Sequence, residues 1–137
     1  MQATAEKPAT PSVGTDPVRV MIIDDNEEFC DTVKQLLEPL GYQVMTVGHP
    51  VKALEKFTRE KGNIDLVLVD YFMPEMDGAK TFEWLRKLNP TVKVLLCSGA
   101  EELKLKQVCA QYRIDGYIHK PFRVHDAQMT IRKVMGN

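Results

Sequence analysis

The sequence has few cysteines and no motif that uses them. Its three cysteines, Cys30, Cys97 and Cys109, are far apart and show no CxxC or Cys/His ligand spacing. This arrangement predicts neither a disulfide framework nor a zinc site, and it fits reduced thiols in a cytosolic protein. A signal peptide and any apolar run long enough to cross a bilayer are also missing. We therefore expect a soluble, cytoplasmic protein that is not inserted in a membrane.

Net charge is nearly absent as well, because 18 basic and 19 acidic residues leave a formal charge of -1. Such a chain has no overall field to hold a polyanion, so we expect no direct nucleic-acid binding. With 137 residues, 44% of them hydrophobic, it is long enough for one core. Residues 1–17, rich in Ala, Thr and Pro, lack periodicity and are predicted to be a flexible leader or linker, followed by one domain over 18–137.

Short apolar runs alternate with amphipathic stretches from Val18 onward. They predict strands at 18–23, 42–47, 64–69, 92–97 and 115–118, and helices at about 26–40, 50–61, 77–88, 101–112 and 123–135. Apolar stripes support the helices, with Phe29, Val33, Leu36, Leu37 and Leu40 in the first and Val124, Ala127, Ile131 and Val134 in the last. Pro39 is expected to distort or end the first helix.

The third apolar run, Leu66 to Val69, has no polar alternation, which is typical of a parallel strand buried on both faces. Strict alternation and right-handed crossovers favour a flavodoxin-like (βα)5 fold of the α/β class. This fold is a doubly wound, five-stranded parallel sheet of order 2-1-3-4-5 with helices on both faces. Ligands bind such a sheet at the carboxyl ends of its strands.

Polar residues stand at the ends of four apolar runs: Asp24-Asp25, Asp70, Ser98 and Lys120-Pro121. In one parallel sheet these ends lie together, so three carboxylates, a hydroxyl and an ammonium are predicted to share a pocket. Two unit negative charges ~4 Å apart repel by ~4 kcal/mol at an effective dielectric near 20, so the acids need a cation. Mg2+ is the predicted cofactor, and a carboxylate neutralised in this way can attack a phosphoryl donor.

These strand ends resemble the receiver domain of response regulators in two-component signalling. The resemblance spans residues 18–137 and rests on Asp24-Asp25, the run from Asp70 to Gly78, Ser98-Gly99 and the run from Tyr117 to Phe122. It implies a signalling domain that catalyses only its own phosphorylation and dephosphorylation, and is otherwise no enzyme. The phosphoryl group would pass to Asp70 from a histidine kinase or a histidine phosphotransfer protein in a Mg2+-dependent reaction.

The resemblance also implies roles for the neighbouring residues. Asp25, Asp70 and the backbone carbonyl of Phe72 would coordinate Mg2+, and Asp24 would act partly through water. Lys120 would pair with the phosphoryl oxygens, and its peptide bond to Pro121 would be cis. Ser98 and Tyr117 would form the switch, because the hydroxyl moves toward the phosphoryl group and the aromatic ring then changes rotamer.

We expect no output domain within this chain, because the last predicted helix reaches almost to Asn137. The resemblance therefore implies a signal passed to a downstream protein target or an output domain in trans. The expected surface is formed by helix 101–112, strand 115–118 and helix 123–135, which phosphorylation would shift toward a conformation that a partner prefers. Leu103, beside Lys104 and Lys106, suggests a partly apolar docking surface, with a solvated helix as the alternative. The same face is a candidate for a phosphorylation-dependent homodimer.

The resemblance implies that the side chains two residues after Asp70 and two residues after Ser98 border the path by which water reaches the acyl phosphate. Phe72 lies two residues after Asp70, and Ala100 lies two residues after Ser98. Neither side chain can hydrogen-bond a water molecule, so we expect slow self-dephosphorylation.

Several of these residues also have simpler, structural interpretations. Asp24 and Asp25 are also suited to solvated or helix-capping positions, and Asn26 is a second capping candidate. Ser98 is typical of turns in which serine bonds the backbone, and Tyr117 is as suited to packing as to switching. The run from Met73 to Gly78 is expected to shape a loop and start the third helix, and the three histidines are assigned no role.

Three other functions compete with the receiver. A haloacid-dehalogenase-type phosphatase also uses a strand-end aspartate and Mg2+, but counting from Asp24 its required second acid is replaced by Asn26. A dinucleotide or flavin binder would suit the fold, although no G-x-G-x-x-G follows the first strand. A docking module that works without phosphorylation would not need the complete acidic set and Lys120.

Overall fold

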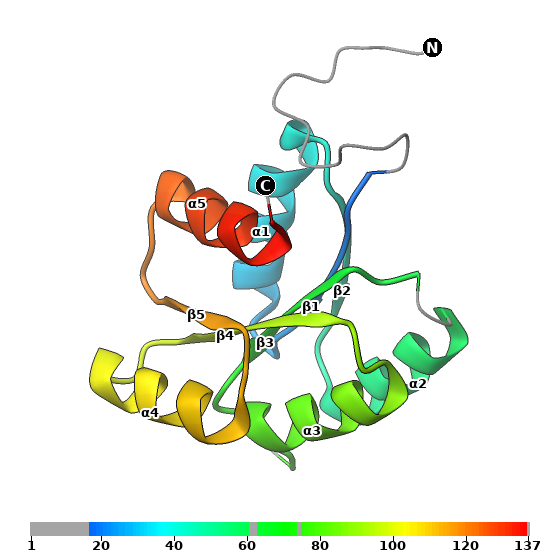
Figure 1. Cartoon of the computed structure of the whole chain (residues 1–137). Helices are drawn as coiled ribbons and strands as arrows, with labels where there is room; N and C mark the ends of the chain where they lie inside the picture. Colours follow the sequence, from blue (N-terminus) through cyan, green and yellow to red (C-terminus); the bar gives the residue numbers. More distant parts are fainter. Residues whose placement is uncertain (1–16, 61–62, 74, 137) are drawn as a thin grey trace.

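Strands and helices alternate along the chain, as the apolar runs predict (Figure 1). The computed structural model describes residues 17–60, 63–73 and 75–136. The strands are β1 (Arg19–Ile23), β2 (Gln43–Val47), β3 (Leu66–Asp70), β4 (Lys93–Ser98) and β5 (Gly116–His119). The helices are α1 (Glu27–Leu37), α2 (Pro50–Glu60), α3 (Gly78–Leu88), α4 (Glu102–Tyr112) and α5 (Val124–Met135). The predicted leader, apart from Pro17, and Pro74 of the predicted loop lie outside the described residues.

All five strands pair in parallel in the order β2-β1-β3-β4-β5, which confirms the predicted flavodoxin-like fold. Ile23 at the end of β1 pairs with Val69 of β3, and Asp70 pairs with Cys97 of β4. The order reverses between β1 and β3, the point at which doubly wound sheets bind their ligands. The topology therefore places residues 24–25 and Asp70 at the expected binding edge.

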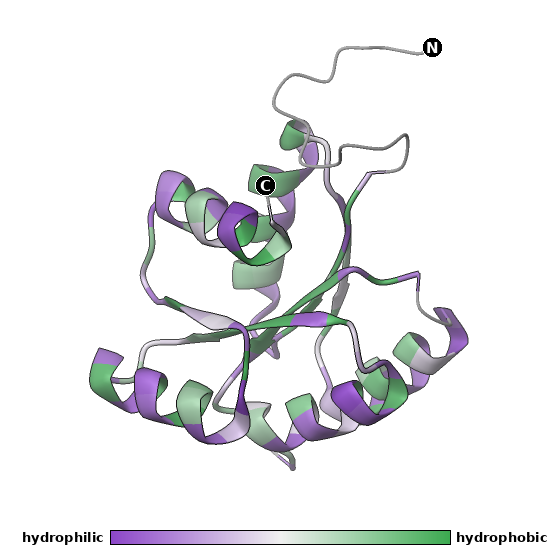
Figure 2. Cartoon of the chain, in the orientation of Figure 1, coloured by the Kyte–Doolittle hydropathy of each residue, from purple (hydrophilic) through white to green (hydrophobic). Residues whose placement is uncertain are grey.

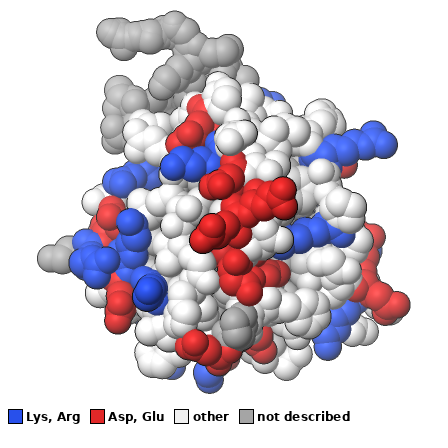
Figure 3. All heavy atoms as spheres, turned by 180° about the vertical axis from the view of Figure 1, so that it is seen from behind, with Lys and Arg blue, Asp and Glu red and all other residues white. Residues whose placement is uncertain are grey.

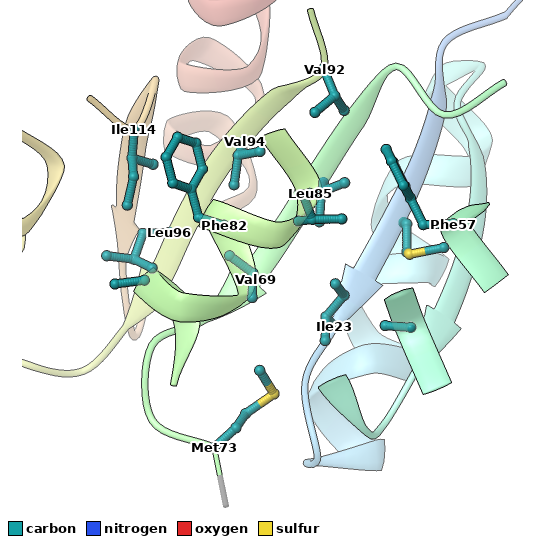
Figure 4. Close-up of a cluster of buried hydrophobic side chains, with 14 of the residues drawn as sticks. Ile23, Phe57, Val69, Met73, Phe82, Leu85, Val92, Val94, Leu96 and Ile114 are labelled. Atoms are coloured by element: carbon teal, nitrogen blue, oxygen red, sulfur yellow. The ribbon is translucent and has the colours of Figure 1, made fainter. Parts of the chain in front are cut away.

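Two hydrophobic cores lie on opposite faces of the sheet. Helices α1 and α5 cover one face, and α2, α3 and α4 cover the other (Figure 1). Alternate residues of each strand point to opposite faces, so Val69 and Leu96 pack with Phe82 and Leu85 of α3 in the core of Figure 4. Figure 2 shows the buried strands as mainly hydrophobic and the outer helices as mixed, which is typical of a central parallel sheet.

Local differences from the predicted elements have identifiable causes. The first helix ends at Leu37 and continues as a short 3-10 helix, η2 (Glu38–Leu40), because Pro39 has no N–H to extend the α-helical ladder. Val124, the first residue of α5, lies on the apolar face predicted for the last helix, because it lines one apolar pocket with Ala127 and Ile131. It is nevertheless 40% exposed.

No described helix has the length and apolar character needed to cross a membrane.

Candidate functional site

Three carboxylates meet at the carboxyl edge of the sheet, as the strand ends predict. One oxygen of each of Asp24, Asp25 and Asp70 lies within 4.8 Å of the others. Asp24 is only 2% exposed and Asp70 only 8%, whereas Asp25 is open to solvent. Oxygen ligands at this spacing suit a hard divalent cation such as Mg2+, which binds one or two carboxylates and keeps several waters.

The start of α1 fixes the acidic pair. The Asp24 N–H donates to the Val47 carbonyl at 3.1 Å, and its Oδ1 accepts a bond from the Asn26 N–H at 2.9 Å. Asn26 in turn caps the helix, because its side chain accepts from the Phe29 N–H at 3.0 Å. Asn26, and not either aspartate, is therefore the N-cap, and both carboxylates of the pair remain turned to the site.

Acidic residues continue beyond the cluster into the first turn of α1, where Glu27 and Glu28 favour the positive end of the helix dipole. Figure 3 shows Asp and Glu side chains gathered in a band on the face seen from behind. This concentration of negative charge on a chain of almost zero net charge favours a bound cation.

The loop after β3 holds Asp70 against α3. Gly78 donates its N–H to the Tyr71 carbonyl at 2.9 Å, and a Cβ on Gly78 would lie 2.7 Å from the Asp70 carbonyl oxygen. A larger residue would push this backbone apart, so glycine is required for the close approach. The Asp77 side chain caps α3 by accepting from the Lys80 N–H, as expected for the start of this helix.

Lys120 brings a positive charge into the same site from the far edge of the sheet. Its Nζ lies 2.7 Å from Asp24 Oδ2 and 3.8 Å from Asp70 Oδ1. Its backbone N–H donates to the Ser98 carbonyl at 2.7 Å, and the Lys120–Pro121 bond is cis, as the resemblance implies. Burial disfavours the ammonium, but the hydrogen bond and negative charge of Asp24 outweigh it, so the pKa of Lys120 is raised.

The Asp70 carboxyl is held in a less ionised state than an ordinary aspartate. Burial, followed by the negative charge of Asp24, raises its pKa from 3.8 to about 6. The positive charge of Lys120 and a hydrogen bond from the Phe72 backbone lower the pKa but do not cancel these effects. A divalent cation beside Asp70 would favour the carboxylate, so the site is poised to bind one.

This raised pKa predicts that Asp70 destabilises the protein above pH 6 when divalent ions are absent. The folded pKa of about 6 exceeds the unfolded value of 3.8, so the free energy of unfolding falls as pH rises through this window. We expect Asp70→Asn to raise the free energy of unfolding at pH 7 by roughly 2 to 3 kcal/mol and to change it little near pH 4. Urea denaturation in EDTA at both pH values measures this, and equal effects at the two would contradict it.

Ser98 ends β4 and is fully buried beside the strand that carries Asp70. Its Oγ accepts a bond from the Ala100 N–H at 3.0 Å, which is the turn role that serine alone predicts. The hydroxyl hydrogen remains free to donate to another acceptor. The two interpretations of Ser98 are therefore compatible.

Tyr117 and Phe72 lie at the margin of the site. The Tyr117 hydroxyl donates to Glu102 Oε2 of α4 at 2.7 Å, and this bond raises the pKa of Tyr117 to about 12. The tyrosine is thus tied to α4 rather than to Ser98. The Phe72 ring is 61% exposed and meets Tyr71 edge-on, with the ring centroids 4.8 Å apart.

Sequence analysis missed two contacts around the site. The Phe29 ring centroid lies 3.9 Å from Lys120 Nζ, although its spacing predicts only a core residue. His49 Nε2 lies 2.9 Å from Glu75 Oε2, joining the loop after β2 to the loop after β3. For Phe29 a signal was available, since it lies in the first turn of the helix that begins directly after the Asp24-Asp25 pair.

Comparisons with known proteins agree on one family. The pattern of the response regulator receiver domain matches residues 20–132. The chain is 30% identical over 120 residues to the transcriptional regulatory protein ZraR of Klebsiella oxytoca, covering 88% of this chain and 27% of ZraR. It resembles the crystal structure of a CheY-like receiver domain protein from Methanospirillum hungatei JF-1, with a TM-score of 0.79, 29% identity, and 87% and 94% of the two chains covered.

A further structure shares the fold at lower identity. The receiver domain of the sensor histidine kinase PA1611 from Pseudomonas aeruginosa PAO1 gives a TM-score of 0.77 at 21% identity, covering 88% of this chain and 98% of that one. That domain has a magnesium ion coordinated in its active site cleft. The chain spans only about a quarter of the length of ZraR, so the match concerns one region of that regulator.

Proposed function

The chain belongs to the response regulator receiver domain family, and from this membership we propose that it accepts a phosphoryl group on Asp70. The donor is the phosphohistidine of a histidine kinase or of a histidine phosphotransfer protein. One observation carries the proposal: the clustered oxygens of Asp24, Asp25 and Asp70 lie beside Lys120 Nζ, which is 2.7 Å from Asp24 and 3.8 Å from Asp70.

The acidic cluster fits Mg2+ because it offers only hard oxygen ligands and is short of positive charge. We assign the ligands to Asp25, Asp70 and the Phe72 carbonyl, with Asp24 acting partly through water. The PA1611 receiver domain, which shares this fold, has a magnesium ion in its active site cleft, and this supports a magnesium site here. When bound, the ion would neutralise the acids and the phosphoryl oxygens.

In the transfer step, a carboxylate oxygen of Asp70 attacks phosphorus while the bond from phosphorus to the donor histidine nitrogen breaks. The product is an acyl phosphate on Asp70 and a free donor histidine. Lys120 then pairs with a phosphoryl oxygen instead of Asp24, and the free hydroxyl hydrogen of Ser98 donates to another. Water later hydrolyses the acyl phosphate, so the domain catalyses only its own phosphorylation and dephosphorylation.

The signal would leave through α4, β5 and α5. A groove of about 640 Å3 lies along this face and is bordered by both Glu102 and Tyr117. Release of Tyr117 from Glu102, when Ser98 turns to the phosphoryl group, would alter that border. Leu103 is 65% exposed on α4 and would contact a downstream target, an output domain in trans or a second copy of the chain.

Labelling with acetyl phosphate tests the proposal. Here Asp70 attacks phosphorus and acetate leaves, so no kinase is needed. We expect mass spectrometry to locate the phosphoryl group on Asp70 with Mg2+ present and to find none in EDTA. Turnover through Asp24 would instead support the phosphatase, and a folded protein that is never labelled by acetyl phosphate or kinases would support the docking module.

Phe72, the exposed aromatic residue two positions after Asp70, predicts a long-lived phosphorylated form. Asparagine at position 72 can hold a water by a hydrogen bond worth about 1 kcal/mol, so we expect Phe72→Asn to shorten the lifetime roughly fivefold. Phe72→Leu, which stays apolar, is the control and should change the lifetime little. Decay of labelled protein after removal of acetyl phosphate measures it, and a lifetime that is unchanged or longer in Phe72→Asn would refute the prediction.

A further inference from the structure

The ammonium of Lys120 has a neighbour that is neither an acid nor water. Its Nζ lies 3.9 Å from the centroid of the Phe29 ring, within the range of a cation–π contact. The same nitrogen donates to Asp24 at 2.7 Å and faces Asp70 at 3.8 Å. Two carboxylates and one aromatic face therefore surround the ammonium, although the Lys120 side chain remains 22% exposed to solvent.

The Phe29 ring is itself held in place. The Phe122 ring meets it edge-on, with centroids 5.9 Å apart and an interplanar angle of 89°. The Phe29 backbone N–H donates at 3.0 Å to the side chain of Asn26, the N-cap of α1. The ring is thus fixed by the start of α1 on one side and by the segment after β5 on the other, the two parts of the chain that carry Asp24-Asp25 and Lys120.

From this geometry we infer that Phe29 is a positioning residue for Lys120 during phosphoryl transfer. The inference rests on the proposed function of Asp70. Lys120 must leave Asp24 to reach a phosphoryl oxygen, and a hydrogen bond to a second fixed acceptor would oppose this movement. The ring face attracts the ammonium without demanding one direction, so the charge stays in the site while it changes partners.

Replacing the ring with an aliphatic side chain tests this role. We expect Phe29→Leu to slow labelling of Asp70 by acetyl phosphate roughly three- to tenfold at saturating Mg2+, the effect of losing one cation–π contact. Mg2+ affinity, measured by calorimetric titration, should change less than twofold because the Phe29 ring carries no atom that can bind the ion. Phe29→Tyr keeps the aromatic face and is expected to restore the rate.

Phe29 packs against the edge of the hydrophobic core and lines an open groove of about 440 Å3. Leucine keeps an apolar side chain at this half-buried position, so we expect Phe29→Leu to fold. Leu36 lines the same groove, so Leu36→Ala controls for lost packing and should label at the parent rate. A second measurement is independent of activity: in NMR spectra, the Lys120 methylene protons next to Nζ should be shifted upfield by the ring in the parent and in Phe29→Tyr. They should return to ordinary values in Phe29→Leu.

The outcomes separate the two proposals. Labelling of Phe29→Leu at the parent rate, or equal slowing in Phe29→Leu, Phe29→Tyr and Leu36→Ala, would overturn the positioning role and leave Asp70 as the acceptor. Absence of any label on parent Asp70 would overturn the proposed function and this inference together. Slowing in Phe29→Leu with recovery in Phe29→Tyr and an unchanged Mg2+ affinity would support the inference.

Discussion

Asp70→Asn is expected to lower phosphorylation by acetyl phosphate at least about a hundredfold, the largest effect of any substitution proposed for this chain. The amide oxygen of asparagine is a weak nucleophile, and the substitution also removes one of the charges that would hold Mg2+. The pKa of Asp70, about 6, leaves the parent side chain mainly ionised at pH 7.5. The parent therefore has a reactive carboxylate that the asparagine variant lacks. Phosphate incorporated per chain after incubation with Mg2+ measures the loss.

Asp65→Asn is a matched control, at the end of β3 opposite to Asp70. Asp65 precedes β3, and its carboxylate accepts a bond from the Arg19 N–H at 2.9 Å, a bond that an asparagine oxygen can also accept. Asp65→Asn should therefore fold and label as the parent does. Labelling of the Asp70→Asn protein at the parent level would place the acceptor elsewhere and refute the proposed function.

Sequence reasoning could predict the acidic cluster because it depends on topology alone. Once Leu66–Val69 is recognised as a central parallel strand, Asp24-Asp25 and Asp70 must end neighbouring strands. No detail of side-chain packing is needed for this step. Lys120 joins the cluster for the same reason, although 96 residues separate it from Asp24 in the chain.

Topology alone could not predict which carboxylate Lys120 contacts. Lys120 forms its short contact with Asp24 and not with Asp70, a difference between 2.7 and 3.8 Å that depends on side-chain rotamers. The Phe29 contact and the bond from Tyr117 to Glu102 are likewise set by rotamers and by the positions of α1 and α4. Sequence periodicity places a residue on a face, but it does not determine which of several nearby groups that residue touches.

The contact between Lys120 and Asp24 predicts the second large effect. Lys120→Met keeps an apolar stem of similar length but leaves the Asp24 carboxylate, which is 2% exposed, without its cation. Removal of one partner of a buried pair strands the other charge, so we expect a loss of about 3 kcal/mol in free energy of unfolding in EDTA. Lys93→Met, on the exposed first residue of β4, is the control and should cost less than about 0.5 kcal/mol.

Two further measurements identify the stranded carboxylate as the cause. The double variant Asp24→Asn/Lys120→Met should recover most of the lost stability, because the amide carries no charge to compensate. Mg2+ should stabilise Lys120→Met more than the parent, since the ion would replace the missing positive charge among three acids. If the double variant is as unstable as Lys120→Met, and Mg2+ stabilises parent and variant equally, the pair contributes through packing and not through charge. An electrostatic origin instead requires that the ammonium of Lys120 and a divalent ion neutralise the same carboxylates, so that each partly substitutes for the other.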